Sequence, residues 1–179
     1  MAALIPSASA TGSGTMTLAG PSTNSNQTIT IPDATGTMMV SGNMPAFYVT
    51  KSGTQSITGG STTKVTFDTK TFDTASIFNT STSVLTPNVA GYYLINVLLG
   101  FGTTGTSAQI NLNKNGSLAM NAPPFSYNSS IGGQMALTTL IYMNGTTDYL
   151  EIYTYGPLTM TISANSQNTQ FSGYLVRNA

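Results

Sequence analysis

Five carboxylates are the side chains of this 179-residue chain that could carry acid–base chemistry: Asp33, Asp68, Asp73, Asp148 and Glu151. A glycan-cleaving site needs two carboxyl groups facing each other across the substrate, about 5–10 Å apart. Asp148 and Glu151 are three positions apart in an expected strand, which places them on opposite faces. Asp68 and Asp73 flank an expected loop, and Asp33 lies in the N-terminal segment. The chain has no His to activate a Ser nucleophile and no G-x-S-x-G elbow, so we expect a protein that is not an enzyme.

The chain has neither Cys nor His, and this excludes nearly every kind of zinc, copper or haem site. Calcium needs only oxygen ligands, and Asp148, with Asn144 and backbone carbonyls nearby, is the calcium candidate. The alternative is that Asp148 ends a hairpin and accepts hydrogen bonds from turn amides. A single carboxylate makes a poor calcium site, so we expect no cofactor apart from this candidate.

Tyrosines are the remaining candidates for a binding surface. Tyr153 and Tyr155 share one parity in an expected strand whose other parity, Leu150 and Ile152, is apolar. A tyrosine face can stack on sugar, line a subunit contact or cover a sheet, and the sequence leaves these three uses open. With Tyr127, these tyrosines are the receptor-surface candidates. Receptor contact is expected at the exposed loops 102–107, 123–133 and 156–157.

The composition predicts an all-β protein. Charged residues make up 6% of the chain, against roughly 25% in a typical soluble protein. Thr, Ser, Asn and Gly supply the polarity, and these residue types favour strands and turns over helices. Five cations spread along a chain of zero net charge exclude the basic footprint of a nucleic-acid-binding protein. A surface with so little charge tends to associate, and no apolar segment is long enough for membrane insertion.

Residues 44–179 form the expected head, a run of short strands with closely spaced turns that is typical of a sandwich or jelly roll. The expected strands cover residues 46–51, 63–67, 92–99, 109–113, 118–120, 135–143, 148–155 and 171–176. The nearly continuous apolar segment 92–99 predicts a strand that is covered on both faces. Asn115-Gly116 predicts a hairpin, because a type I′ turn needs positive φ at both of its central positions.

Residues 1–43 form a separate segment that holds too few large apolar groups to bury a core alone. Residues 1–14 are expected to be a tail, and short strand patterns follow at 15–18, 28–31 and 37–40. The sequence TITIPDATGT at 28–37 resembles short β-modules found in tail fibres and other appendages of bacterial viruses. That resemblance implies a stem that anchors the chain on a virion, with the apolar anchoring candidates Leu18, Ile29, Ile31 and Met38.

Residues 45–176 resemble, nearly end to end, the globular head of the complement-1q family, a jelly roll related to tumour necrosis factor. The similarity lies in several short segments: PAF at 45–47, VTFD at 65–68, FN at 78–79, LTP at 85–87, VAGYY at 89–93, LNKNG at 112–116, TDYLEI at 147–152 and FSGYL at 171–175. One departure is Ser83, which stands where the family usually has a turn glycine. The absence of a collagen-like tract in front of the head argues against the animal immune version.

The resemblance implies a jelly-roll sandwich of about ten strands that forms a homotrimer. It places Phe47, Tyr142, Phe171 and Tyr174 on strands that line the three-fold contact. Together with the appendage-like segment, it predicts a bacteriophage fibre or knob in the virion. The N-terminus would contact other virion proteins, and the head would bind a host-surface glycan or receptor. Two alternatives stay open: a capsid decoration (cement) protein with a purely structural role, and a secreted cellular complement-like ligand.

Overall fold

The computed structural model describes residues 44–102, 106–128, 130–164 and 167–179. The chain divides into two units, Met1–Gly36 and Thr37–Ala179, and all described residues belong to the second. The expected N-terminal module 1–43 lies outside the described residues, together with its anchoring candidates Leu18, Ile29, Ile31 and Met38.

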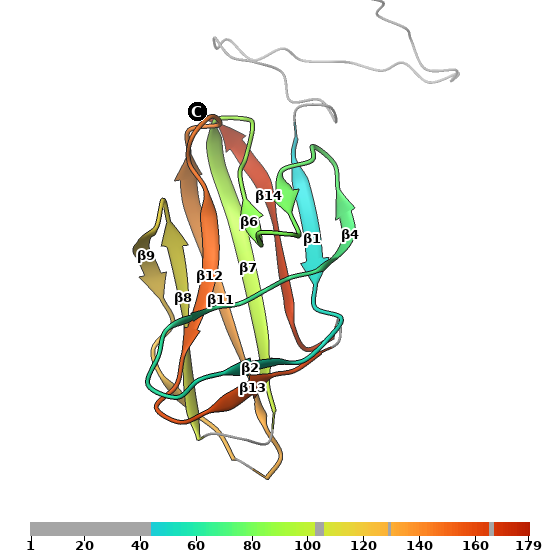
Figure 1. Ribbon diagram of the computed structural model, residues 1–179. Helices are drawn as coiled ribbons and strands as arrows, with labels where there is room; N and C mark the ends of the chain where they lie inside the picture. The colour runs from blue at the N-terminus through green and yellow to red at the C-terminus, as the bar shows by residue number, and fades with distance from the viewer. Residues whose placement is uncertain (1–43, 103–105, 129, 165–166) are drawn as a thin grey trace, which may run out of the picture. The chain divides into compact units, whose positions relative to one another are not determined.

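Two antiparallel seven-stranded sheets make up the described part of the chain, in which no helix occurs (Figure 1). The strands are β1 (Ala46–Thr50), β2 (Gln55–Ile57), β3 (Thr63–Lys64), β4 (Thr69–Asp73), β5 (Phe78–Asn79), β6 (Val84–Leu85), β7 (Gly91–Phe101), β8 (Ser107–Lys114), β9 (Ser117–Asn121), β10 (Phe125–Ser126), β11 (Gly133–Met143), β12 (Leu150–Tyr155), β13 (Met160–Ile162) and β14 (Gln170–Asn178). The prediction of an all-β jelly roll is confirmed. β3, β5, β6 and β10 have only two residues each, and the other ten strands match the expected number. In the same residues, no helix is available to span a bilayer.

The strand order is the non-sequential order of a jelly roll. The first sheet, called sheet 1, runs β2-β13-β7-β14-β1-β4, and β11 pairs with the opposite edge of β7. The second, called sheet 2, runs β10-β8-β12-β6-β5, with β9 paired to β8 and β3 paired to β12. Because β1 and β7 both pair with the last strand, β14, the two ends of the described chain meet at the centre of sheet 1.

Four phenylalanines interlock between the sheets. The ring centroid of Phe171 lies 5.0 Å from Phe47, 5.5 Å from Phe67 and 5.7 Å from Phe78, mostly edge to face. All four side chains are at most 3% exposed. The structure therefore corrects the prediction that Phe47 and Phe171 line a subunit contact, because both are buried in the core of a single chain.

Within a single chain, other residues cover only one face of β7. Tyr93, Ile95 and Leu99 are fully buried against the core, and the Tyr93 hydroxyl donates to Val89 O at 2.9 Å. Tyr92, on the opposite face, is 44% exposed, and its neighbours of the same parity are partly exposed. The prediction that both faces of 92–99 are covered is therefore wrong for one chain, and an apolar strand face remains open.

Two turns show how local sequence sets the backbone. Asn115 and Gly116 take φ values of 53° and 78°, which confirms the expected type I′ hairpin between β8 and β9. Ser83 has a φ of 52°, the left-handed conformation for which glycine is the usual choice. Its hydroxyl oxygen accepts a hydrogen bond from the buried Phe67 N–H at 2.9 Å, an interaction that glycine could not make.

Candidate interaction surfaces

Exposed aromatic and aliphatic side chains gather on the outward face of sheet 1. Cross-strand partners share a face, and the pairs Tyr92↔Tyr142, Leu94↔Leu140 and Leu94↔Tyr174 join β7 to β11 and β14. The exposed fractions of Tyr92, Leu140, Tyr142 and Tyr174 lie between 41% and 55%. The rings of Tyr92 and Tyr142 are 5.5 Å apart. We call these five residues the sheet-1 patch; Tyr142 and Tyr174, expected at a subunit contact, lie on it.

A row of small polar side chains crosses the same face beside the patch. The Thr138 hydroxyl donates to Asn96 Oδ1 at 2.9 Å, and Ser172 is the partner of Asn96 on β14. Further along the row, the rings of Tyr48 and Phe72 lie 6.1 Å apart. Along β7 and β11, no outward residue is charged. This face is therefore suited to contact another apolar or neutral surface.

A second exposed apolar surface lies at the edge of sheet 2. All five residues of β9 are exposed, and β8 is the only described strand that pairs with it. Leu118, Met120 and Phe125 are 59%, 40% and 39% exposed. We call these three residues the β9 edge. An open edge of this kind offers unpaired backbone groups and apolar side chains to another chain.

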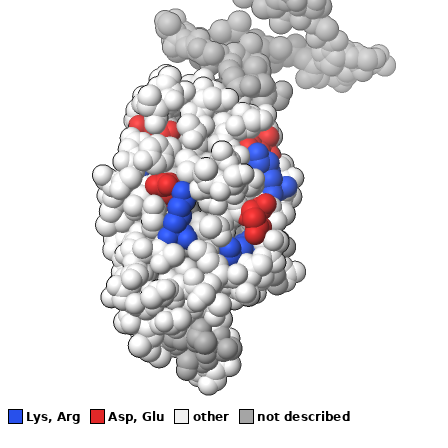
Figure 2. Space-filling model, viewed as in Figure 1, with Lys and Arg blue, Asp and Glu red and all other residues white. Residues whose placement is uncertain are grey.

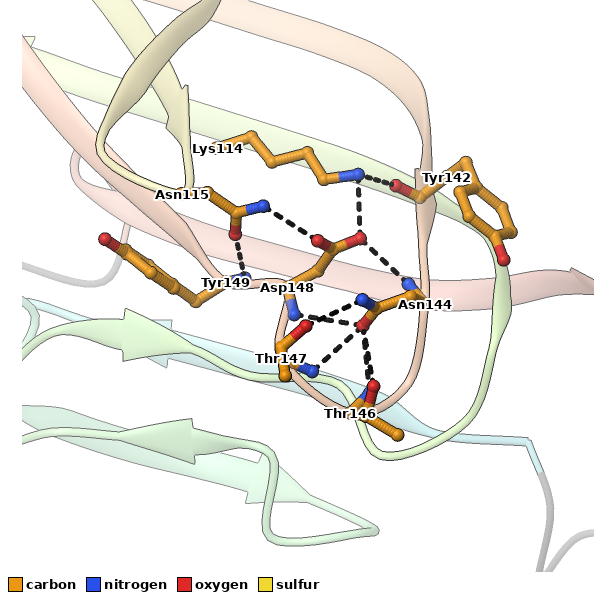
Figure 3. A network of polar contacts seen from close by, with 8 residues as sticks. All are labelled: Lys114, Asn115, Tyr142, Asn144, Thr146, Thr147, Asp148 and Tyr149. Atoms are coloured by element: carbon orange, nitrogen blue, oxygen red, sulfur yellow. Dashed lines mark hydrogen bonds and ion pairs between the residues drawn. The ribbon is translucent and has the colours of Figure 1, made fainter.

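A polar network joins the β8–β9 turn to the β11–β12 turn (Figure 3). Asp148 Oδ2 lies 2.8 Å from Lys114 Nζ and accepts from Asn144 N–H at 2.9 Å. Its other oxygen, Oδ1, accepts from Asn115 Nδ2 at 2.8 Å. The bond from Asn115 and the ammonium group of Lys114 hold the pKa of Asp148 below its ordinary value.

The side chain of Asn144 closes the turn that carries Asp148. Asn144 Oδ1 accepts from the backbone N–H groups of Thr146, Thr147 and Asp148, each at 3.0 Å. The following residue, Gly145, has a φ of 73°, and a Cβ there would lie 2.4 Å from Ala90 N. Sterics at this close approach therefore require the glycine.

Lys114 links this network to the sheet-1 patch. Its Nζ donates to the Tyr142 carbonyl oxygen at 2.7 Å and lies 5.6 Å from the centroid of the Tyr142 ring. Such a distance permits a cation–π contact. The network that fixes two turns of the sandwich thus also holds Tyr142 at the end of the patch.

The surroundings of Asp148 favour the hairpin interpretation over the calcium interpretation. Both carboxylate oxygens are bonded to protein donors, and the Lys114 ammonium beside them would repel a divalent cation. Among the described residues, no group of three or more Asp, Glu, His or Cys side chains could hold a metal ion. Asp148 therefore has the geometry of a turn-stabilising residue.

The other described carboxylates lie in separate contacts. Glu151 pairs with Lys64 at 2.7 Å, and Asp73 pairs with Lys70 at 2.8 Å. Asp68 accepts from Ser52 N–H at 2.8 Å. On the face that Figure 2 shows, charged groups form a few small clusters and the other coloured residues are uncharged.

Two expectations about these carboxylates need correction. Asp148 lies in the turn before β12 and not in a strand with Glu151, because Asn144 extends that turn to Asp148. The segment between Asp68 and Asp73 was expected to be a loop and is strand β4, because it pairs with β1. Burial acts to raise the pKa of both carboxyl groups, but hydrogen bonds outweigh it. Bonds from Ser52 hold the pKa of Asp68 below its ordinary value. Bonds from Lys70 and Phe78 do the same for Asp73.

The three receptor-surface tyrosines separate in the structure. Tyr153 and Tyr155 are partly exposed on β12, on the face opposite to its buried residues, as their parity predicts. Tyr127 is only 9% exposed, and its ring stacks on Phe101 at 5.6 Å and on Phe125 at 6.2 Å. Burial also raises the pKa of its hydroxyl. Tyr127 is therefore corrected from a receptor candidate to a packing residue.

The sequence reasoning missed the β9 edge. Leu118–Met120 was expected to be an ordinary strand, and its two apolar side chains gave no reason to place them in solvent. The signal was present in the flanks: the segment is a short strand between the Asn115-Gly116 turn and Pro123-Pro124. Proline cannot donate to a pairing ladder, so the segment is limited to a short strand, a kind that is common at sheet edges.

Comparison with known proteins agrees with this geometry. No curated protein matches the chain in sequence. Among solved structures, the chain is similar to murine APRIL at pH 5.0 with a TM-score of 0.60 and 11% identity, over 74% of this chain and 99% of that one. It is similar to the globular domain of zebrafish complement 1qA with a TM-score of 0.54 and 18% identity, over 75% and 98%. It is also similar to Eiger TNF from S. frugiperda with a TM-score of 0.59 and 12% identity, over 76% and 93%.

The comparison of sequence with family models gives a match to one domain. The model of the C1q domain matches residues 46–176, which begins at the first residue of β1 and reaches into β14. The matched segment is well over half of the chain and holds all but the last residues of the described strands. The chain belongs to the C1q domain family.

Proposed function

We propose that this chain is a trimeric, non-catalytic binding head on an appendage of a bacterial virus, anchored to the particle by residues 1–43. The sheet-1 patch is the observation that carries the trimer. Leu140 on β11 and Tyr174 on β14 are 55% and 47% exposed on the outward face of sheet 1 in a folded chain. Patches of this kind on a soluble protein mark sites of association.

The positions of the two apolar surfaces favour a ring over a two-fold dimer. The sheet-1 patch belongs to the outward face of sheet 1, whereas the β9 edge belongs to the rim of sheet 2. Contact between two different surfaces of the same chain is heterologous, and it forms a closed ring when the rotation closes. Heads of the complement-1q and tumour-necrosis-factor type assemble as homotrimers, which supports three copies.

The oligomer is tested with two matched variants of the full chain. Leu140→Glu places a charge on the sheet-1 patch, whereas Leu158→Glu changes a residue of similar exposure outside it; the two leucines are 55% and 54% exposed. Light scattering coupled to gel filtration should give three times the 18.6 kDa chain mass for the wild type and for Leu158→Glu. A smaller mass is expected for Leu140→Glu. A wild-type chain that stays monomeric at micromolar concentration would contradict the proposal.

The virion location is supported by the sequence at 28–37, which resembles appendage modules, and by the order of the chain, in which the head follows that segment. Antibody labelling of intact particles, viewed by electron microscopy, should mark the tips of tail appendages. Labelling spread over the capsid lattice would instead support the decoration-protein alternative. The family match is also compatible with a secreted complement-like ligand, and detection of the chain only in a cell's secreted fraction would favour that role.

A binding role without catalysis is supported by the distribution of carboxylates. Asp73, Asp148 and Glu151 each pair with a different lysine, whereas glycan cleavage uses two carboxyl groups that face each other across the substrate. Incubation of the trimer with host envelope polysaccharide should leave its chain length unchanged on a sizing column. Shortening that is abolished by Glu151→Gln would show a hydrolytic site and contradict this part of the proposal.

A further inference from the structure

The outward face of sheet 2 carries two cross-strand pairs of an amide and a tyrosine. Asn111 on β8 is the partner of Tyr153 on β12, and Gln109 is the partner of Tyr155. Partners in register point to the same side of a sheet, so these four side chains form one surface. All four alternate with buried residues such as Ile110 and Ile152, which fixes their direction away from the core.

A cavity of about 160 Å³ opens at the Tyr155 end of this surface. Its lining residues are Ser107, Ala108, Gln109, Pro124, Tyr155 and Pro157. A volume of that size holds about five waters at ~30 Å³ each, enough for one small ring or substituent. An aromatic ring and two prolines give the cavity apolar walls, and Gln109 places an amide on its rim. Small-ligand sites commonly combine apolar walls with a few fixed polar groups.

The amides of this surface are already ordered. Gln109 Nε2 donates to Asn111 Oδ1 at 2.7 Å, which orients both side chains. Gln109 Oε1 and Asn111 Nδ2 make no hydrogen bond to another described residue. Among the described residues the one buried side-chain atom without a partner is Asn178 Oδ1, so Asn111 Nδ2 keeps access to solvent. One acceptor and one donor are therefore held in place beside the cavity for groups of a ligand.

This surface is neutral. Its two charged side chains, Lys64 and Glu151, are paired with each other at 2.7 Å. Among the residues that Figure 2 colours, the lower end of the face in view carries no charged group. Recognition of a sulfate, phosphate or sialic acid would call for free Arg or Lys side chains. The surface is suited instead to an uncharged ligand with many hydroxyl groups.

We propose that the Tyr155–Gln109 cavity, with the amide row beside it, binds a neutral saccharide unit. The Tyr155 ring contacts the apolar C–H face of the sugar. Gln109 Oε1 accepts from one hydroxyl, and Asn111 Nδ2 donates to another. The inference rests on the proposed role as a binding head, and it names the ligand class of that head. In the proposed trimer three copies of this cavity add avidity.

The test uses the full chain and defined probes. Glucose, galactose, mannose, N-acetylglucosamine and rhamnose are screened by saturation-transfer NMR, and multivalent conjugates of the same sugars by biolayer interferometry. Sialic acid and a ten-residue polyproline peptide serve as competing ligand classes. At least one neutral sugar should bind, and Tyr155→Ala and Gln109→Ala should weaken it by about tenfold or more. Tyr155→Phe keeps the ring and should retain most of the affinity.

Tyr149→Ala is the matched control, because Tyr149 is a partly exposed tyrosine just before the other end of β12. It should bind as the wild type does, and circular dichroism should show all variants folded. Binding that Tyr155→Ala leaves unchanged, or binding of only sialic acid or the peptide, would overturn the site. A native trimer that binds no neutral sugar would overturn this inference alone. A monomer would contradict the proposed assembly, while its response to free sugars would still decide the site.

Discussion

Lys114 Nζ lies 2.8 Å from Asp148 Oδ2 and 5.6 Å from the centroid of the Tyr142 ring. One lysine thus contacts both the carboxylate that organises two turns and a tyrosine of the sheet-1 patch. The Asp148 side chain is 10% exposed, so water screens the pair only in part. This contact makes the stability of the head dependent on the charge of Asp148.

Asp148→Asn should destabilise the head at neutral pH by about 1–2 kcal/mol, the scale of bonds to a charged group at a partly exposed site. The pKa of Asp148 is lowered in the folded chain, mainly by Asn115 and Lys114. Its carboxylate therefore stabilises the fold above the unfolded value of about 3.9 and loses that effect as the pH falls through the lower folded value. Urea unfolding at several pH values should show the variant and the wild type converging in acid. A constant difference at all pH values would contradict this account, and Lys114→Met should reproduce part of the effect.

Ser83 separates the cost of a backbone conformation from the value of a hydrogen bond. Ser83→Gly accepts the φ of 52° without strain but leaves the Phe67 N–H without its partner. Ser83→Ala loses the same bond and keeps the strain, so it should be less stable than Ser83→Gly by about 1 kcal/mol. Both variants should be less stable than the wild type, because a buried donor without a partner costs about 1–3 kcal/mol. Thermal unfolding by calorimetry gives the order, and equal stabilities of the glycine and alanine variants would exclude the backbone contribution.

Tyr93 should make the head sensitive to alkali. Burial raises the pKa of its hydroxyl to about 12, and the neutral hydroxyl donates to Val89 O at 2.9 Å. The unfolded side chain ionises near pH ~10, so the stability that this group contributes is present below that pH and is lost as the pH rises towards the folded value. Tyr93→Phe should lose less stability than the wild type between these two pH values. Equal losses of stability in Tyr93→Phe and the wild type between these two pH values, followed by urea unfolding, would contradict this account.

Phe171 and Tyr174 are three residues apart on β14 and should respond to truncation in different ways. Phe171 is fully buried among other phenylalanines, so Phe171→Ala should cost about 3–5 kcal/mol of folding free energy. Tyr174 lies on the sheet-1 patch, so Tyr174→Ala should leave chain folding nearly unchanged and weaken the oligomer. Unfolding midpoints and light-scattering masses of both variants distinguish the two effects. A dissociated but fully stable Phe171→Ala would restore Phe171 to the subunit contact.

Features that depend on neighbouring residues could be predicted from the sequence. The Asn115-Gly116 turn follows from its φ requirements, the parity of Tyr153 and Tyr155 follows from the two-residue period of a strand, and the scarcity of charge with many Thr and Asn indicates an all-β chain. The similarity of 45–176 to a known head supplied the jelly roll. Alternation within β14 did not reveal whether Phe171 or Tyr174 faces the core, because aromatic residues occur at both parities.

The tertiary structure decided which aromatic side chains are covered and by what. Phe47 and Phe171 enter the core because β1 and β14 pair across the full length of the described chain, a contact that no local pattern contains. Tyr127 is buried by stacking on Phe101 and Phe125. Phe101 is distant in sequence, and the sequence does not show that the nearby Phe125 ring turns towards Tyr127. Gln109 and Asn111 meet Tyr155 and Tyr153 only through the β8–β12 register. Sequence sets the local conformation of each strand, whereas register between distant strands determines which side chains share a surface.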